Sequence, residues 1–304
     1  MSEPLVTVCI LAFNRKNDVD NTLSKVFEQN YRSIEVILVD NASSDGTGDM
    51  VREKYPMVIL MELKENIGIA GWNEGLKKAS GKYVLILDDN AYPHEDAVTN
   101  AVKIFESDPS HRIAMVAFNI FDLRTEQLWD SRWLPGNRKL AGTMPIFVAC
   151  AFMVDRSKVD VTSLMPPHYF LYQNELVIAA KIHNNGHVIH YSPDIIGYHW
   201  FFADNGYSKR KDRLIFQNNL FFIVESLPGT AVIPYVIQNL LFFLTRSIRY
   251  GWINEYRDTV STVFRTFRRN NVIRWNYFLE LRRLHIFNFS LLSKLKFYDR
   301  TGKS

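Results

Sequence analysis

The stretch YVLILDDNAYP, from Tyr83 to Pro93, joins a run of apolar residues to two adjacent carboxylates. The run from Tyr83 to Leu87 is continuously apolar, which is typical of a strand covered on both faces in a parallel sheet. In such sheets ligands bind beyond the carboxyl ends of the strands, where Asp88 and Asp89 stand. The stretch therefore predicts a buried strand that presents two carboxylates to a ligand.

The residues on either side of this strand extend the same pattern. Apolar runs that read as strands precede it at 5–11, 34–39 and 58–61, and helical stretches lie between them at about 17–29, 45–54 and 70–79. Alternating strands and helices indicate a doubly wound α/β fold. The middle third is more mixed, with strands expected at 113–118, 147–154 and 188–191 and a helix at 174–184.

The last third of the chain is helical, aromatic and basic, with a soft boundary near Tyr207. We therefore predict an α/β domain with a mixed central sheet at 1–207 and a helical region at 208–304. The two cysteines, Cys9 and Cys150, lie in apolar runs and are expected to be buried free thiols of a reduced compartment.

The expected location of the protein is cytoplasmic. No basic residue precedes the first apolar run, which is therefore read as a strand and not as a signal peptide. No stretch approaches the roughly 20 uninterrupted apolar residues of a membrane span. The best candidate, residues 231–244, is short and interrupted by Pro234, Gln238 and Asn239.

The net charge of +4 is unevenly distributed along the chain. From Lys209 onward 17 Lys and Arg oppose 6 Asp and Glu, a net charge of +11, whereas the first 208 residues hold 19 against 26, a net charge of −7. Basic residues alternate with aromatic ones, as in FRTFRR at Phe264–Arg269 and RRLHIFNF at Arg282–Phe289. This mixture suits an anionic membrane surface.

The basic region is also compatible with two different roles. Its aromatic residues could be core or oligomer contacts of a helical appendage, and the oligomeric state is not predicted. Nucleic-acid binding shares the composition. No nucleic-acid motif accompanies it, so no nucleic-acid partner is expected.

Two more motifs follow strands of the α/β region. In VDNASSDGT, at Val39–Thr47, Asp40 at the strand end could accept hydrogen bonds from a nucleobase, while Asp45 and Thr47 can cap the next helix. In ENIGIAGWNEG, at Glu65–Gly75, the glycines allow close backbone approach and Asn73 can bond loop carbonyls. Each motif alone is equally explained by turn or packing chemistry.

The acidic pair Asp88 and Asp89 has a more specific explanation. Two adjacent carboxylates at the end of a buried strand raise each other's pKa unless a cation intervenes. A divalent metal bound to a diphosphate would relieve this repulsion, and oxygen ligands suit Mg²⁺ or Mn²⁺. The alternative is a helix cap beside a surface acid.

The order AFNR, VDNASSDGT, ENIGIAGWNEG and LDDNAYP resembles family 2 glycosyltransferases of GT-A fold, especially the bacterial rhamnosyl- and galactosyltransferase-like branch. The similarity continues through FVACAFMVDR at Phe147–Arg156, YFLYQNELVIAAKIHNNG at Tyr169–Gly186, and Tyr198–His199. It implies an inverting hexosyltransferase that uses a nucleotide-diphosphate sugar and Mn²⁺ or Mg²⁺. The implied acceptor is a glycan or lipid-linked saccharide in cell-surface polysaccharide synthesis, at the inner face of the cell membrane.

The resemblance also implies the residues of the site. Those implied to bind the nucleotide sugar are Ala12, Phe13, Asn14, Arg15, Asp40, Asn66, Gly71, Asn73 and Asp88, although Ala12 stands where the family usually has Thr. Asp89 is the first choice as metal ligand, and His199 matches a histidine near the metal or diphosphate. A lone histidine at the end of an apolar strand is otherwise more often a core residue.

The general base is the point at which the chain departs most from the family. Where the family commonly has Glu-Asp, with Asp as base, this chain has Asn174 and Glu175. Asn174 has no titratable group, so Glu175 is the expected base. A helix-start acid favoured by the helix dipole is the alternative role for Glu175.

Two departures from the family leave a non-enzymatic alternative open. Asn90 replaces a frequent third Asp of the acidic motif, and Asn174 replaces the Glu of Glu-Asp. The alternative is a catalytically inactive nucleotide-sugar-binding module of GT-A fold. A sugar-nucleotide pyrophosphorylase would need a Gly-rich phosphate loop after the first strand, where this chain reads LAFNRKND.

Overall fold

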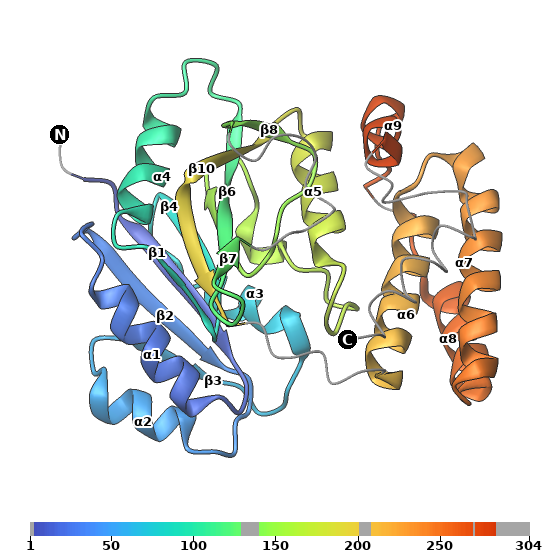
Figure 1. Ribbon diagram of the computed structural model, residues 1–304, viewed down its shortest axis with the longest axis horizontal. Helices are drawn as coiled ribbons and strands as arrows, with labels where there is room; N and C mark the ends of the chain where they lie inside the picture. Colours follow the sequence, from blue (N-terminus) through green and yellow to red (C-terminus); the bar gives the residue numbers. More distant parts are fainter. Residues whose placement is uncertain (1–2, 129–139, 201–207, 270, 284–304) are drawn as a thin grey trace. The chain divides into compact units, whose positions relative to one another are not determined.

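The computed structural model describes residues 3–128, 140–200, 208–269 and 271–283 (Figure 1). The chain divides into two compact units. The first unit comprises Met1–Phe170 and Asn185–Phe202, and the second comprises Leu171–Asn184 and Ala203–Ser304. The predicted boundary at Tyr207 lies outside the described residues.

The first unit is an α/β structure whose described strands form one ten-stranded sheet. The strands are β1 (Val6–Ala12), β2 (Ile34–Asp40), β3 (Ile59–Glu62), β4 (Tyr83–Asp88), β5 (Ala91–Pro93), β6 (Ile113–Asp122), β7 (Gln127–Leu128), β8 (Gly142–Met144), β9 (Ala151–Asp155) and β10 (Val188–His199). The helices are α1 (Lys16–Phe27), α2 (Thr47–Lys54), α3 (Gly71–Leu76) and α4 (Ala97–Glu106), with short 3₁₀ turns at Gly68–Ala70 and Val161–Ser163.

The sheet is mixed, as predicted. Its order is β3-β2-β1-β4-β9-β6-β10-β5, with β7 paired to β6 and β8 paired to β10. Strands β3, β2, β1 and β4 are parallel, β9 runs antiparallel to β4 and β6, and β10 is parallel to β6. In the pairing, Ala12 lies opposite Asp40, and Leu11 lies opposite Asp88. The carboxyl ends of β1, β2 and β4 therefore meet at one edge.

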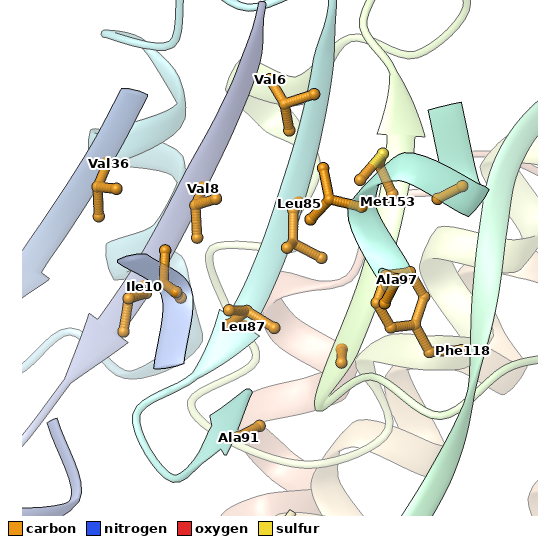
Figure 2. Close-up of a cluster of buried hydrophobic side chains, with 14 of the residues drawn as sticks. Val6, Val8, Ile10, Val36, Leu85, Leu87, Ala91, Ala97, Phe118 and Met153 are labelled. Carbon is orange, nitrogen blue, oxygen red and sulfur yellow. The ribbon is translucent and has the colours of Figure 1, made fainter. Parts of the chain in front are cut away.

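The hydrophobic core of the first unit lies between one sheet face and helices α1, α2 and α4. Alternate residues of β1 point into it, because successive side chains of a strand face opposite sides. Figure 2 shows Val6, Val8 and Ile10 of β1 beside Leu85 and Leu87 of β4, all fully buried. This packed layer fixes the positions at which the strands end and their polar residues emerge.

Helix α3 packs closely on β1 and β2, and two glycines permit it. A Cβ added to Gly71 would lie 2.5 Å from Leu11 Cδ1, and one added to Gly75 would lie 2.6 Å from Val39 Cγ2. The contacted methyl groups would have to move to admit a Cβ at either position. The close approach expected from the glycines of this motif is thus confirmed as packing against the sheet.

The second unit is helical in its described residues. Its helices are α5 (Asn174–Asn184), α6 (Lys209–Ser226), α7 (Gly229–Arg249), α8 (Ile253–Thr266) and α9 (Trp275–Arg283). Its core is aromatic: Phe216 of α6 stacks on Tyr256 of α8, with ring centroids 4.9 Å apart, and lies beside Trp252, which is fully buried. Much of the aromatic content of this region therefore forms core, as one of the two alternative roles predicted.

Among the described helices, α7 alone is long and apolar enough to cross a membrane by length and composition. This finding rests on length and composition and does not contradict the prediction from the sequence, which concerned an uninterrupted apolar run. Helix α7 reaches the required length with Pro234, Gln238 and Asn239 inside it. Its inner face packs against α6 and α8.

Candidate functional site

The first unit collects polar residues at the carboxyl edge of its parallel strands. Two loops meet there: one follows β1, and the other follows β2. The Asn14 N–H donates to Ser43 Oγ at 2.9 Å, and the Ser44 N–H donates to Asn14 Oδ1 at 2.7 Å. Asn14 and Ala42 both have left-handed backbone, with φ of 53° and 65°. Cross-bonding of the loops holds these unusual conformations in place.

Asp45 joins the same two loops from the other side. Its Oδ1 accepts from the Thr47 N–H at 3.0 Å, and its Oδ2 accepts from the Lys16 N–H at 2.9 Å. Burial would raise the pKa of Asp45, but the hydrogen bonds from Thr47 and the Lys16 N–H together lower it. The N-cap of α2 is Gly46, which makes no side-chain cap bond, so the predicted cap by Asp45 or Thr47 is not formed. Asp45 instead forms an Asx-type turn before α2 and anchors the start of α1.

An open pocket of about 590 Å³ lies beside these loops. It is lined by Asn14, Arg15, Lys16, Asn17, Asp18 and Asp45. Its volume is in the range of small-molecule sites. Phe13, which precedes this segment, is 42% exposed, so an aromatic ring is available to a ligand at the same edge.

Asp40 is almost fully buried at the end of β2. Its Oδ1 accepts from the Ser43 N–H at 2.9 Å, and its Oδ2 lies near Gly48 of α2, where an added Cβ would be 3.3 Å away. The carboxylate therefore shapes its own turn, as the turn interpretation of this motif expected. Contact with a nucleobase stays a prediction.

Asp89 secures the loop after β1. Its Oδ2 accepts from the Phe13 N–H at 3.2 Å, and its Oδ1 lies 3.5 Å from Arg15 Nη1. Its own carbonyl accepts from Thr22 Oγ1 at 3.0 Å. Burial raises the pKa of Asp89 to about 7, Arg15 opposes the rise, and Asp88 adds to it. The expected repulsion between the two carboxylates thus contributes, although burial is the larger cause.

Asp88 points to a different partner from Asp89. Its Oδ2 lies 3.4 Å from His199 Nε2 at the end of β10. Asn90 holds this end of β10, because its Nδ2 donates to the Trp200 carbonyl at 2.8 Å while the Trp200 N–H donates to the Asn90 carbonyl at 3.1 Å. A carboxylate could not make the first of these bonds. Asn90 therefore has a structural use at the position where the family often has a third Asp.

These residues fit a divalent cation that is shared with a ligand. No three His, Cys, Asp or Glu side chains in the described ranges lie close enough to hold a metal by themselves. Asp88 and His199 offer one carboxylate oxygen and one imidazole nitrogen, donors that suit Mn²⁺. Few protein ligands are typical of an ion that also binds substrate phosphates. Asp89, the first ligand expected from the sequence, directs its carboxylate at Phe13 and Arg15, and its role as metal ligand stays a prediction.

The motif around Asn66 braces the loop after β2. Asn66 Oδ1 accepts from Asn41 Nδ2 at 3.0 Å and from the Gly68 N–H at 2.9 Å. Asn73 exchanges two 2.9 Å hydrogen bonds with the backbone of Met165, which confirms that it bonds a loop carbonyl. Asn66, Gly71 and Asn73 thus have structural roles here, and their contact with a nucleotide stays a prediction.

Asn41 also belongs to this hydrogen-bonded group, although no role was predicted for it from the sequence. Asn41 is almost fully buried, and its side chain donates to the Gly68 carbonyl and accepts from the Ile67 N–H, each at 3.0 Å. It joins the end of β2 to the loop before α3. Its position directly after Asp40 at a strand end was the available signal.

Glu175 belongs to the second unit. It is half-buried in the first turn of α5, whose bounds agree with the predicted helix. Asn174, the first residue of α5, is buried. The backbone before it is unusual: Tyr172 and Gln173 both have left-handed φ, at 72° and 64°.

The comparisons with known proteins address the family. The model of "Glycosyl transferase family 2" matches residues 7–162, a stretch that contains Asp40, Asp88 and Asp89 and ends before Glu175 and His199. A poly-beta-1,6-N-acetyl-D-glucosamine synthase of Staphylococcus aureus is 31% identical over 107 residues. These are 34% of this chain but only 26% of that protein. The UDP-Glc:alpha-D-GlcNAc-diphosphoundecaprenol beta-1,3-glucosyltransferase WfaP of Escherichia coli is 31% identical over 106 residues, 34% of this chain and 42% of that protein.

Solved structures resemble this fold over longer stretches. The mannosyltransferase PcManGT from Pyrobaculum calidifontis, solved in complex with GDP-Man and Mn²⁺, has a TM-score of 0.60 at 20% identity and covers 99% of this chain and 86% of its own. Residues 1–349 of TarS from S. aureus have a TM-score of 0.58 at 14% identity, covering 84% of this chain and 81% of that one. At these identities the similarity establishes the fold, which agrees with the predicted GT-A class.

Proposed function

Because the chain belongs to glycosyl transferase family 2, we propose that it transfers a sugar from a nucleotide-diphosphate donor to a glycan or lipid-linked acceptor, with inversion at the anomeric carbon. The observation that carries this proposal is the arrangement at the carboxyl edge of the sheet. There Asp88 lies beside His199, and Asp89 fastens the loop that borders the pocket.

The donor's parts fit different portions of this edge. The nucleoside occupies the pocket beside Asn14 and Arg15, with Phe13 available for stacking and Asp40 at the neighbouring strand end. The diphosphate lies toward Asp88 and His199, which would hold a divalent cation together with its oxygens. When bound, the cation supplies positive charge that stabilises the departing nucleoside diphosphate. In the same way, the Arg15 guanidinium adds a fixed positive charge at this edge.

The transfer step is a direct displacement with Glu175 as general base. The Glu175 carboxylate accepts the proton of the acceptor hydroxyl while that oxygen bonds to the anomeric carbon. The bond from this carbon to the diphosphate oxygen breaks, and the electron pair leaves with the nucleoside diphosphate. Attack from the face opposite the leaving group gives inversion.

We further propose that the protein works on the cytoplasmic face of a membrane, through helix α7. Four aliphatic residues of α7 are largely exposed: Ile233 (70%), Ile237 (52%), Leu241 (49%) and Ile248 (67%). Their spacing puts them on one side of the helix. An exposed apolar stripe of this length marks an interaction surface.

The opposite side of α7 argues that the helix lies on the bilayer instead of crossing it. It buries Gln238 and Asn239, and Arg246 forms a two-pronged ion pair with Asp212 of α6. Arg249 stacks on Tyr250 at the end of the stripe, an arrangement suited to headgroup depth. The net charge of +11 from Lys209 onward favours anionic lipid.

A donor screen tests the function. We expect one of UDP-Glc, UDP-GlcNAc and GDP-Man to raise the unfolding temperature of the full chain, with a larger rise when Mn²⁺ is present. The bound donor is then incubated with alpha-D-GlcNAc-diphosphoundecaprenol, and NMR of the product gives the anomeric configuration.

Each outcome of the screen has a distinct meaning. A product of inverted configuration supports the proposal, and a retained configuration contradicts the displacement. Donor binding without turnover on this acceptor or on short poly-N-acetylglucosamine favours the inactive binding module. If EDTA leaves the donor-induced rise in unfolding temperature unchanged, donor binding does not need a metal, and the metal site is contradicted.

A further inference from the structure

The segment directly before helix α5 has an unfavourable backbone, and a side chain of α6 binds it. Tyr172 and Gln173 are consecutive non-glycine residues with left-handed φ. L-residues rarely adopt this conformation even singly, because Cβ crowds the carbonyl oxygen. Two in succession persist only where the surrounding structure fixes them.

Among the described residues, Asn218 of α6 binds this turn through its side chain. Its Nδ2 donates to the Leu171 carbonyl at 2.8 Å and to the Tyr172 carbonyl at 2.8 Å. One amide group thus uses both of its N–H bonds on two successive carbonyls of the turn. Both hydrogen bonds lie within the second unit.

Asn218 is itself rigidly placed. It is fully buried in the middle of α6, two residues after Phe216, which is locked between the rings of Tyr256 and Phe243. A buried donor that loses its partner is costly, so the amide and the turn constrain each other. Because the aromatic core holds α6 in place, Asn218 in turn holds the 171–173 turn in place.

This turn leads straight into Glu175, three residues after Tyr172. We propose that Asn218 is a positioning residue for Glu175: it fixes the direction in which the first turn of α5 presents that carboxylate. The inference rests on the proposed role of Glu175 as base. Asn218 acts through the backbone and touches neither donor nor acceptor.

A double-mutant cycle on the full chain tests this proposal, with donor turnover as the readout. The donor is whichever of UDP-Glc, UDP-GlcNAc and GDP-Man gives the largest Mn²⁺-dependent thermal shift. Glu175→Gln is expected to lower kcat roughly 10²–10⁴-fold. Asn218→Leu, similar in size but without a donor, is expected to lower kcat about 10- to 100-fold, because small misplacements of a reacting group are that costly. The donor KM and the donor-induced thermal shift should not change. In the Glu175→Gln background, Asn218→Leu should have no further effect on kcat.

The other end of the same helix supplies a matched control. Asn184, the last residue of α5, donates from Nδ2 to the carbonyls of Asn271 and Val272 at 3.1 and 3.0 Å. Asn184→Leu therefore removes the same kind of amide–backbone bonds from α5, at the end opposite Glu175. It should lower the unfolding temperature and leave kcat unchanged.

The results separate the two proposals. Near-normal turnover of Glu175→Gln would rule out Glu175 as the general base, regardless of the result for Asn218→Leu. A large loss in Glu175→Gln with normal kcat in Asn218→Leu overturns only the positioning role, as does an equal loss from Asn218→Leu in both backgrounds. If Asn218→Leu is unfolded at the assay temperature, Asn218→Ser replaces it in the same cycle. Its single O–H can serve only one carbonyl, and kcat should fall by a smaller factor.

Discussion

Asp88 and Asp89 are neighbours in the chain, yet their side chains make different contacts. Asp88 lies 3.4 Å from His199, whereas Asp89 bonds Phe13 and pairs with Arg15. Successive residues at a strand end point in opposite directions. In the proposed site Asp88 would therefore face the cation, while Asp89 fastens the loop that borders the pocket.

The first prediction separates these roles by substitution. Asp88→Asn should abolish the effect of Mn²⁺ on the donor-induced thermal shift, because a ligand oxygen loses its charge. Asp89→Asn should weaken donor binding with or without Mn²⁺, because the loop at Phe13–Arg15 loses its anchor. The measurement is a thermal-shift titration of both variants. The reverse pattern would identify Asp89 as the metal ligand, as first expected from the sequence.

The second prediction concerns Asn90. Asn90→Asp replaces a buried donor to the Trp200 carbonyl by a carboxylate that faces that oxygen. Leaving such groups unsatisfied costs about 1–3 kcal/mol, and more when one is charged. Chemical denaturation of Asn90→Asp should show at least this loss, while the exposed Asn254→Asp should change the free energy of unfolding little. An unchanged stability of Asn90→Asp would mean that the hydrogen bond is dispensable and that Asn90 was not retained for it.

At the scale of elements, a buried ion pair joins α6 to α7 within the second unit. Arg246 Nε lies 2.7 Å from Asp212 Oδ2, and Arg246 Nη2 lies 3.0 Å from Asp212 Oδ1. Both side chains are largely buried, at 15% and 7% exposed. Removing one partner leaves an uncompensated buried charge.

The third prediction follows from that pair. Asp212→Ala should lower the free energy of unfolding by about 3–5 kcal/mol, whereas the apolar double replacement Asp212→Leu with Arg246→Met should recover most of the loss. Urea denaturation measures both. As a control, Glu62→Gln breaks an exposed pair with Arg52 and should cost at most about 1 kcal/mol. If the double variant is as unstable as Asp212→Ala, the attraction within the ion pair itself stabilises the interface. The loss in Asp212→Ala would then not come from leaving Arg246 charged and unpaired.

Helix α4 was not predicted, although the sequence contains the pattern of a helix there. Its buried residues are Ala97, Val98, Ala101, Val102 and Phe105, which recur at helical spacing. This signal is present in the sequence between the acidic motif and the strand expected at 113–118, a stretch for which no element was predicted. Helix α5, by contrast, was predicted with its observed bounds because a turn and an apolar run mark its start.

At the scale of the whole molecule, the proposed membrane association rests on the basic helical unit and the apolar stripe of α7. Lys and Arg near an anionic surface each contribute about 1 kcal/mol, an attraction that salt weakens. Burial of the aliphatic stripe adds a contribution that salt does not remove. The two contributions can therefore be measured separately.

The fourth prediction uses this difference. The full chain should sediment with phosphatidylglycerol vesicles at low salt and be partly released at high salt, and should bind phosphatidylcholine vesicles less. The triple variant Ile233→Ser, Ile237→Ser and Ile248→Ser should lose the salt-resistant fraction. Met57→Ser with Ile59→Ser, exposed apolar residues of the first unit, should bind like the parent. Unaltered vesicle binding of the triple variant would assign the α7 stripe to a protein partner.

The sequence by itself determined the α/β class, the mixed sheet, the strand ends that carry Asp40, Asp88 and Asp89, and the helix that carries Glu175. These follow from local periodicity and from polar residues that end apolar runs, information that each segment contains alone. It also led to the family, because several motifs occur in a fixed order along the chain.

Only the tertiary structure decided which side chains meet. That Asp88 faces His199 depends on β10 reaching the same sheet edge as β4, and the Asn90–Trp200 bond beside this pair joins residues 110 positions apart. That Asn218 holds the turn before Glu175 depends on how α6 packs against it. Such contacts depend on distances between segments remote in sequence, which packing of the core sets and local pattern does not encode.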